Sequence, residues 1–258
     1  NDKRGQVTIF IIIAILIVAL ILFFYFFRPG STTTTGFNEK NPEGFIQSCI
    51  EDEIENTVDT LSLQGGSLEP DNYYLYQDNK IQYLEYTSEN YKFCSVQQLL
   101  FKQHVEDEIE ENIKDNVANC FSELKTRYES QAYNVNLQTG NVRVELLPKR
   151  IFTTANYTLT LTKTNTERFE SFNIVLNNNL YELISIANSI VDWESTYGEA
   201  ETSLYMTYYK DLKVEKKGQL DGTKIYIITD RNSGNKFQFA SRSKVLPPGY
   251  GAGGIATN

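Results

Sequence analysis

Histidine and cysteine are scarce in this sequence. Its 258 residues include one histidine, His104, and three cysteines, Cys49, Cys94 and Cys120. The cysteines form no CxxC motif, and His104 cannot complete a zinc site with them at a familiar spacing. A Ser-His-Asp or Cys-His arrangement would also have to use His104, and the sequence has neither G-x-S-x-G nor a phosphate-binding glycine loop. We therefore expect no catalytic residues, no bound metal and no cofactor.

The sequence has fewer basic than acidic residues. The chain has 24 Lys and Arg against 33 Asp and Glu, which gives a net charge of -9. Proteins that bind nucleic acid neutralise phosphates with clustered Lys and Arg, so we expect no nucleic-acid partner. An acidic balance fits a solvated surface that resists nonspecific association.

One run of acidic residues falls within a predicted helix. It comprises Glu106, Asp107, Glu108, Glu110 and Glu111. Carboxylates are suitable ligands for a hard cation such as Ca²⁺. The D-x-[DN]-x-[DN]-G spacing of a calcium-binding loop is absent, however, so we favour a solvated helix face.

The longest feature of the sequence is an uncharged run from Val7 to Phe27. As a helix at about 1.5 Å per residue it would extend about 31 Å, which matches a bilayer core of about 30 Å. It is longer than the apolar region of a cleavable secretory signal and ends in bulky aromatic residues. The run therefore predicts a transmembrane or filament-core helix. Lys3 and Arg4 before it, against Arg28 alone after it, place the following domain outside the membrane.

Composition divides the chain into five parts. They are an anchor helix (1–28), a Pro/Thr-rich linker (29–41), a helical hairpin with a small β insert (42–131), an α+β domain (132–246) and a flexible Gly-rich tail (247–258). Pro29-Gly30 ends the anchor helix. One glycosylation sequon, Asn156-Tyr157-Thr158, lies in the domain expected outside the membrane.

Two helical patterns open that domain. The first runs from Pro42 to Gln64, with an Asn-Pro start and a Gly-Gly end. The second covers Val96 to Tyr128 and carries one continuous apolar stripe. Between them, Tyr73 to Tyr86 has the pattern of an aromatic β-hairpin that turns at Asp78-Asn79.

After the second helix, the spacing between apolar residues changes from about 3.6 residues, typical of a helix, to 2, typical of a strand. Two alternating segments flank Thr139-Gly140-Asn141, which we interpret as a hairpin turn, and the alternation continues through one long strand. The remaining expected elements are that strand (151–161), a further strand (172–176), a helix (177–197) and a closing hairpin (223–230 and 235–240). The predicted fold class is α+β: the N-terminal helix, a helical hairpin with a β insert, and an antiparallel sheet packed by one helix.

Helix geometry narrows the choice of disulfide. Cys94 and Cys120 would lie about 39 Å apart along one helix, which excludes their pairing. If the first two helices are antiparallel, Cys49 near the start of one lies toward the far end of the other. We therefore prefer a bridge between Cys49 and Cys120, with Cys94 free or buried; the alternative is three buried, unpaired cysteines.

Tyrosine and phenylalanine are abundant. The chain contains 17 Tyr and 15 Phe but one Trp. Tyrosine-rich surfaces suit contact with proteins or glycans, although tyrosine is also a common residue within strands.

The start of the chain resembles a known class of signal peptide. Lys3-Arg4-Gly5-Gln6 directly precedes the apolar run, as in archaeal class III signal peptides processed by prepilin-type peptidases. The resemblance implies a cut between Gly5 and Gln6 that leaves the helix in place. The chain also resembles membrane-anchored surface proteins of small-genome archaea, which share a KRGQVTIF-like start and an FxFA-like end, here Phe237-Gln238-Phe239-Ala240.

These observations favour a cell-surface structural protein, pilin-like or membrane-anchored. It would assemble through its N-terminal helix and ectodomain contacts into a filament or layer, with copies of itself, other surface subunits and the membrane as partners. The alternative is a membrane-tethered ligand-binding or sensory ectodomain that acts with a partner subunit. A membrane-tethered enzyme or assembly factor is a third hypothesis.

Overall fold

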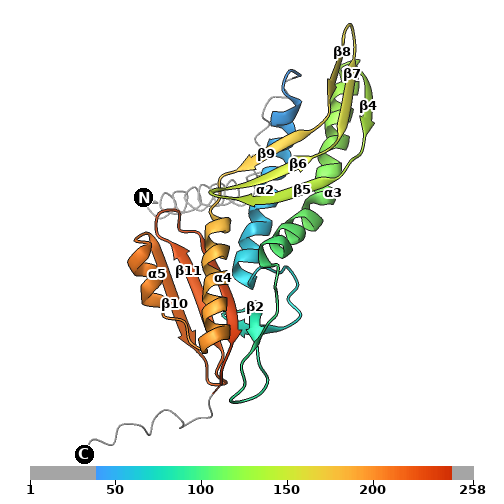
Figure 1. Ribbon diagram of the computed structural model, residues 1–258. Helices are drawn as coiled ribbons and strands as arrows, with labels where there is room; N and C mark the ends of the chain where they lie inside the picture. Colours follow the sequence, from blue (N-terminus) through green and yellow to red (C-terminus); the bar gives the residue numbers. More distant parts are fainter. Residues whose placement is uncertain (1–38, 246–258) are drawn as a thin grey trace, which may run out of the picture. The chain divides into compact units, whose positions relative to one another are not determined.

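The computed structural model describes residues 39–245, and those from Lys40 onward belong to one compact unit. The fold is mixed α+β, as the sequence predicts (Figure 1). Its described helices are α2 (Pro42–Gln64), α3 (Phe101–Ser130), α4 (Leu180–Tyr197) and α5 (Thr202–Tyr208). The expected anchor (1–28), nearly all of the linker (29–41) and the tail (247–258) lie outside the described residues.

Helix α2 has the predicted bounds because its two ends carry strong local signals. The Asn41 side chain accepts a hydrogen bond from the Gly44 N–H at 2.9 Å, and Pro42 occupies the first helical position. Gly65 ends the helix with φ 77°, a left-handed conformation that glycine adopts without strain.

Helix α3 packs along α2 through its predicted apolar stripe. The stripe residues are almost completely buried: Val105, Ile109, Ile113, Val117, Phe121, Leu124 and Tyr128. The helix begins later than the predicted Val96, because Ser95 and Val96 form strand β3 (Ser95–Val96) instead. Their backbone pairs with Tyr86 and Glu85, and this pairing with β2 overrides the local helical pattern.

The middle of the chain forms two three-stranded antiparallel sheets, with orders β4-β7-β8 and β5-β6-β9. Their strands are β4 (Asn134–Gln138), β5 (Val142–Leu147), β6 (Arg150–Ala155), β7 (Thr158–Thr162), β8 (Thr166–Phe169) and β9 (Phe172–Leu176). The hairpin turn predicted at Thr139-Gly140-Asn141 is wrong, because β4 pairs with β7 while β5 pairs with β6. The chain reverses at Pro148-Lys149, and residues 139–141 interrupt an otherwise continuous strand.

A six-stranded sheet combines the β insert with the C-terminal strands. Its order is β1-β2-β12-β11-β10, with β3 also paired to β2. The strands not yet given are β1 (Tyr73–Tyr76), β2 (Asn79–Tyr86), β10 (Leu212–Gly218), β11 (Lys224–Asp230) and β12 (Lys236–Arg242). The β2–β12 pair is parallel, and the other described pairs are antiparallel. The division at 131/132 is therefore not a domain boundary, and the predicted single antiparallel sheet is replaced by three sheets.

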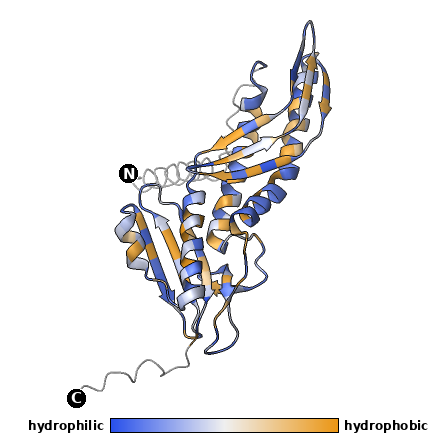
Figure 2. Ribbon diagram, in the orientation of Figure 1, coloured by the Kyte–Doolittle hydropathy of each residue, from blue (hydrophilic) through white to orange (hydrophobic). Residues whose placement is uncertain are grey.

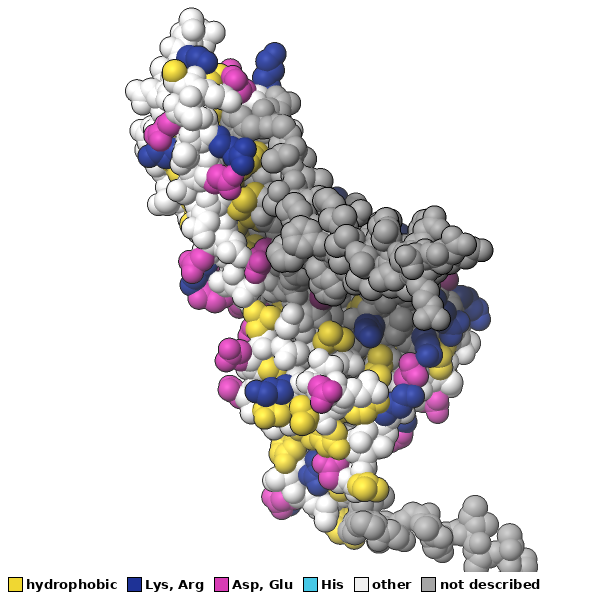
Figure 3. Space-filling model, turned by 180° about the vertical axis from the view of Figure 1, so that it is seen from behind, with side chains coloured by type: hydrophobic (Ala, Val, Ile, Leu, Met, Phe, Trp, Pro, Cys, Tyr) yellow, Lys and Arg dark blue, Asp and Glu magenta, His cyan; other side chains and the backbone are white. Residues whose placement is uncertain are grey.

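The two faces of the six-stranded sheet are both apolar but differ in what covers them. On the face that α2 and α4 cover, the ring of Phe237 makes an edge contact with the ring of Phe101, at 5.8 Å between centroids. On the other face, Ile81, Tyr83, Ile225 and Ala240 form a second buried cluster. Partly buried side chains pack over it: Tyr74, Tyr76, Tyr86 and Ile227. In the view from behind, hydrophobic side chains gather over the half of the domain that holds this sheet (Figure 3).

Within residues 39–245, no helix is long and apolar enough to cross a bilayer. Hydrophobic and hydrophilic residues instead alternate along the helices and strands (Figure 2), as expected when each element has one buried side. The apolar run from Val7 to Phe27, on which the membrane prediction rests, lies outside this range.

Candidate functional site

The most exposed aromatic surface of the described domain lies on α4 and α5. Helix α4 buries one side against the sheet, through residues such as Leu183, Ala187 and Ile190. Its opposite side carries Trp193 and Tyr197, which are 45% and 64% exposed. Their ring centroids are 4.9 Å apart, so one turn of the helix presents two adjoining aromatic rings to solvent.

Helix α5 packs against β10 (Figure 1). Glu201 starts it by accepting a hydrogen bond from the Ser203 N–H at 3.1 Å, and Tyr205 O–H and Ser189 Oγ of α4 lie 2.9 Å apart. None of residues 202–208 is fully buried. A helix this short, with so little buried, depends on its neighbours for stability, and it leaves Tyr208 and the adjoining Tyr209 78% and 57% exposed.

A hollow of about 430 Å³ lies between these two helices. We call it the aromatic groove; its lining residues are Ser189, Trp193, Glu201, Leu204, Tyr205, Tyr208 and Tyr209. A second hollow of about 540 Å³ shares Tyr208 and Tyr209 with it, and its lining also includes Glu182, Asp211 and Asp230. Together the two hollows are lined by aromatic rings and a few carboxylates, a composition typical of binding and contact sites.

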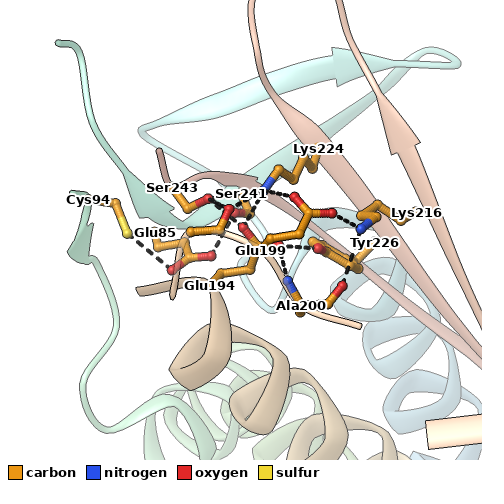
Figure 4. A network of polar contacts seen from close by, with 11 residues as sticks. Glu85, Cys94, Glu194, Glu199, Ala200, Lys216, Lys224, Tyr226, Ser241 and Ser243 are labelled. Carbon is orange, nitrogen blue, oxygen red and sulfur yellow. Dashed lines mark hydrogen bonds and ion pairs between the residues drawn. The ribbon is translucent and has the colours of Figure 1, made fainter. Parts of the chain in front are cut away.

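A buried network of polar side chains fixes the end of α4 beneath this surface (Figure 4). Glu194 is fully buried, and both of its carboxylate oxygens are occupied. One accepts hydrogen bonds from the Ala200 N–H at 2.8 Å and from the Tyr226 hydroxyl. The other accepts from Lys224 Nζ at 2.6 Å and from the Ser243 hydroxyl. Every charge and lone pair here has a partner, which is the condition under which a buried ion pair is tolerated.

Lys224 joins this network to the loop after α4. Its Nζ also donates to the Gly198 carbonyl at 2.7 Å and pairs with Glu199 at 2.8 Å. Burial alone would lower the pKa of Lys224, but the Glu194 and Glu199 carboxylates raise it above its usual value. The lysine therefore stays charged and holds the α4–α5 connection against β11.

A second buried carboxylate, Glu85, reaches the same layer through an irregularity in β2. The register of β2 against β12 shifts between Ala240 and Ser241. Tyr83 pairs with Ala240, whereas Glu85 pairs with Ser241, so the shift places the tyrosine and the glutamate on opposite faces. Without the bulge, residues two apart in a strand would share one face.

Glu85 has neutral partners instead of a cation. Its carboxylate accepts hydrogen bonds from Ser241 Oγ at 2.6 Å and from Cys94 Sγ at 3.2 Å. Burial raises its pKa from the usual 4.5 to about 7. Burial and the neighbouring Glu85 raise the pKa of the Cys94 thiol to about 12, which makes it a poor nucleophile. Glu85 can thus exchange a proton near neutral pH, while Cys94 stays a thiol.

The acidic run on α3 and His104 make structural contacts. His104 Nε2 lies 2.8 Å from Ser67 Oγ, and Glu108 accepts a hydrogen bond from the Leu68 N–H at 3.1 Å. Glu106 pairs with Lys102 and accepts from the Leu146 N–H at 2.6 Å. Across residues 39–245, no group of three or more His, Cys, Asp or Glu side chains could hold a metal ion.

The structure separates the predicted site residues into three sets. Cys49 and Cys120 form a disulfide, with their sulfur atoms 2.00 Å apart, and Cys94 is the free thiol within residues 39–245. Asn156 is exposed, at the break between β6 and β7, and its side-chain amide donates to Asn141 Oδ1 at 3.0 Å. The processing residues Lys3, Arg4, Gly5 and Gln6 lie outside the described residues.

Sequence reasoning missed both the aromatic groove and the buried network. The groove had a signal, since Trp193 and Tyr197 are four residues apart on the side of the helix opposite its apolar stripe. The network had none, because Glu85 and Glu194 look like any other of the 33 acidic residues until the sheet brings them together. Comparison with protein-family models, curated proteins and solved structures gives no match to this chain.

Proposed function

We propose that this chain is a cell-surface structural protein. The apolar segment 7–27 would hold it in the membrane or in the core of a filament, as a transmembrane or filament-core helix. The domain described above would then make contacts with copies of the chain or with other surface subunits, forming a filament or layer.

The observation that carries the proposal is the exposed aromatic surface of α4 and α5. Trp193, Tyr197, Leu204, Tyr208 and Tyr209 are each at least 45% exposed and lie on neighbouring turns. Tyrosine and tryptophan are enriched at the centres of protein interfaces, and a cluster of them on a soluble surface marks a contact site. The buried Glu194–Lys224 pair below holds the C-terminal end of α4, and with it this surface, in place.

Two further features support a location outside the cytoplasm. Disulfides persist in oxidising compartments, and the Cys49–Cys120 bridge joins two helices of the domain. The sequon residue Asn156 is exposed, as an acceptor of a glycan has to be. The charges around segment 7–27 favour the same orientation.

The processing step of this proposal is tested at the N-terminus. If a prepilin-type peptidase acts on the chain, mass spectrometry of the protein purified from its native membrane will find a mature chain that starts at Gln6. A chain that retains Lys3 and Arg4 would instead support an uncleaved anchor and would remove the peptidase from the list of partners.

The assembly step is tested with surface variants of the full-length chain. Tyr208→Ala combined with Leu204→Ala removes two exposed side chains from the contact surface, and Leu75→Ala removes one of similar exposure from β1. We expect the first variant to be lost from purified filaments or envelope sheets and the second to remain. Absence of the unmodified chain from such preparations would refute assembly.

A second candidate function is ligand binding or sensing with a partner subunit. The two adjoining hollows of about 430 and 540 Å³ favour it, because their size and aromatic lining suit a small ligand. A rise in the melting temperature of the full-length chain with one compound of a ligand panel, abolished by Tyr208→Ala, would favour this function over assembly.

A further inference from the structure

The described part of the chain ends beside the C-terminal end of α4, the helix that forms one wall of the aromatic groove. Ser243 Oγ lies 3.1 Å from the Gly198 carbonyl oxygen, and a Cβ placed on Gly198 would lie 2.8 Å from the Cβ of Lys244. Gly198 caps α4, and Trp193 is about one and a half turns earlier, a rise of about 7 Å. Residues that follow Val245 therefore start beside the C-terminal end of the helix that forms one wall of the groove.

The residues that follow have a distinctive composition. They are Leu246, Pro247, Pro248, Gly249 and Tyr250, and they contain the single Pro-Pro pair of the sequence. Two consecutive prolines favour the extended polyproline II conformation, which rises about 3.1 Å per residue. Five such residues span about 15 Å, roughly twice the rise from Gly198 back to Trp193. The segment is long enough to reach the groove from its own chain.

The groove offers the surface that such a segment needs. Proline-rich peptides bind in hollows lined with aromatic side chains, where the rings pack against proline faces and hydroxyl or indole N–H groups donate to the free backbone carbonyls. Trp193, Tyr205, Tyr208 and Tyr209 supply these rings and donors. Residues 246–258 contain no charged side chain, so burial of the segment desolvates no side-chain charge of its own.

We propose that the aromatic groove is a binding site for an extended, proline-containing peptide, and that residues 246–250 of the same chain occupy it. Attachment next to the site gives the segment an effective concentration on the order of 1 mM. A free peptide that bound with a Kd of about 100 µM would then, as part of the chain, favour the bound form by roughly tenfold. Weak individual contacts are thus sufficient, and the preformed extended shape limits the entropy lost on binding.

This docking does not depend on the proposed surface assembly. The two are nevertheless linked, because a docked segment covers part of the contact surface of α4 and α5. If the assembly proposal is right, removal of the segment should increase self-association. If it is wrong, removal should change only the exposure of the groove residues such as Trp193.

Trp193 is the single tryptophan of the sequence, so its fluorescence reports on the groove alone. The experiment compares the full-length chain with a chain that ends at Val245, both in the same detergent. We expect a blue-shifted emission and an acrylamide quenching constant about twofold lower in the full-length chain, because a docked segment excludes water and quencher from the ring. A synthetic peptide of residues 245–253 should restore both properties to the shortened chain.

The controls separate docking from other effects. The double variant Pro247→Ala, Pro248→Ala keeps the length of the tail and should behave like the shortened chain, and the matching peptide should fail to restore protection. Identical Trp193 fluorescence in the full-length and shortened chains would overturn the proposal. Protection that appears only as the protein concentration rises would also overturn it, by showing that the segment of a second copy fills the groove.

Discussion

A Cβ atom on Gly140 would lie 1.7 Å from the carbonyl oxygen of Asn156. The two residues belong to neighbouring strands at the level where both strands are interrupted, and the Asn156 N–H donates to the Asn141 carbonyl at 2.9 Å beside them. Glycine is required at position 140 by this close approach of two backbones. The sequence therefore specifies the break in the strands, through the glycine at position 140.

Replacement of Gly140 by alanine should destabilise the domain. The added methyl group meets backbone, which cannot move aside as a flexible side chain can, so we expect a loss of about 2 kcal/mol or more in the free energy of unfolding. Chemical denaturation measures this loss. Gly218→Ala is the matched control, because no described atom lies within 4 Å of its added methyl group, and it should change stability by less than about 0.5 kcal/mol.

Loss of the Cys49–Cys120 bridge should also be costly. The bridge joins residues 71 apart in the sequence, and closing a loop of that length is worth about 4 kcal/mol in the chain-entropy account. We expect Cys49→Ser with Cys120→Ser to lower the melting temperature clearly under oxidising conditions. Cys94→Ser should have a small effect, since serine can still donate to Glu85, and a reductant that leaves the wild-type melting temperature unchanged would contradict the prediction.

Stability should fall as the pH rises from about 4.5 to about 7, through Glu85. Because its folded pKa is raised to about 7 from the usual 4.5, the folded state binds the proton more tightly than the unfolded state does. Below pH 4.5 Glu85 contributes its full stabilisation. As the pH rises toward 7, this contribution to the free energy of unfolding falls by on the order of 3 kcal/mol. Urea unfolding across this range measures the change.

Glutamine at position 85 cannot ionise and should keep the hydrogen bond from Ser241. Glu85→Gln should therefore flatten the decline in stability between pH 4.5 and 7 and leave the variant more stable than wild type at pH 8. Glu89→Gln serves as a control, because that side chain is 60% exposed. An unchanged decline in Glu85→Gln would show that another group causes it.

Removal of Glu194 should destabilise the domain far more than removal of Glu199, although both contact Lys224. The Glu194 side chain is fully buried, whereas that of Glu199 is 59% exposed. Glu194→Ala leaves the buried lysine without its main partner, for which we expect a loss of 3 to 5 kcal/mol, roughly, against about 1 kcal/mol or less for Glu199→Gln. Equal losses in urea unfolding would mean that the network does not hold α4 as described.

The sequence predicts the elements whose signals are local. Helix α2 has an asparagine cap, an apolar stripe and a terminal glycine, and the structure reproduces its bounds. The hairpin of β1 and β2 forms, but its turn lies one residue earlier than expected, at Gln77 and Asp78, which both have positive φ. The preferred pairing of Cys49 with Cys120, which rested on helix length and on an antiparallel arrangement of the first two helices, is confirmed. Cys94, however, precedes α3 and does not lie on it.

The rest depends on contacts between distant residues. Thr139-Gly140-Asn141 has the composition of a turn, yet the strands on either side pair elsewhere, and only tertiary structure decides between a turn and an interrupted strand. The parallel pairing of β2 with β12 joins segments that are separated in the sequence by most of the domain, and no local sequence pattern predicts it. Glu85 and Glu194 become a site only after that pairing places them in one layer.

The disulfide also has a mechanical consequence for a chain held at its N-terminal end. Force that entered from the proposed anchor would reach the domain at the start of α2. Only about the first two turns of this helix precede Cys49. Beyond that point the covalent link to Cys120 passes the load directly to α3 and its packed stripe. The bridge thus shields residues 50–119 from direct extension, so a pull from the proposed anchor could lengthen the chain ahead of Cys120 only over the few residues before Cys49.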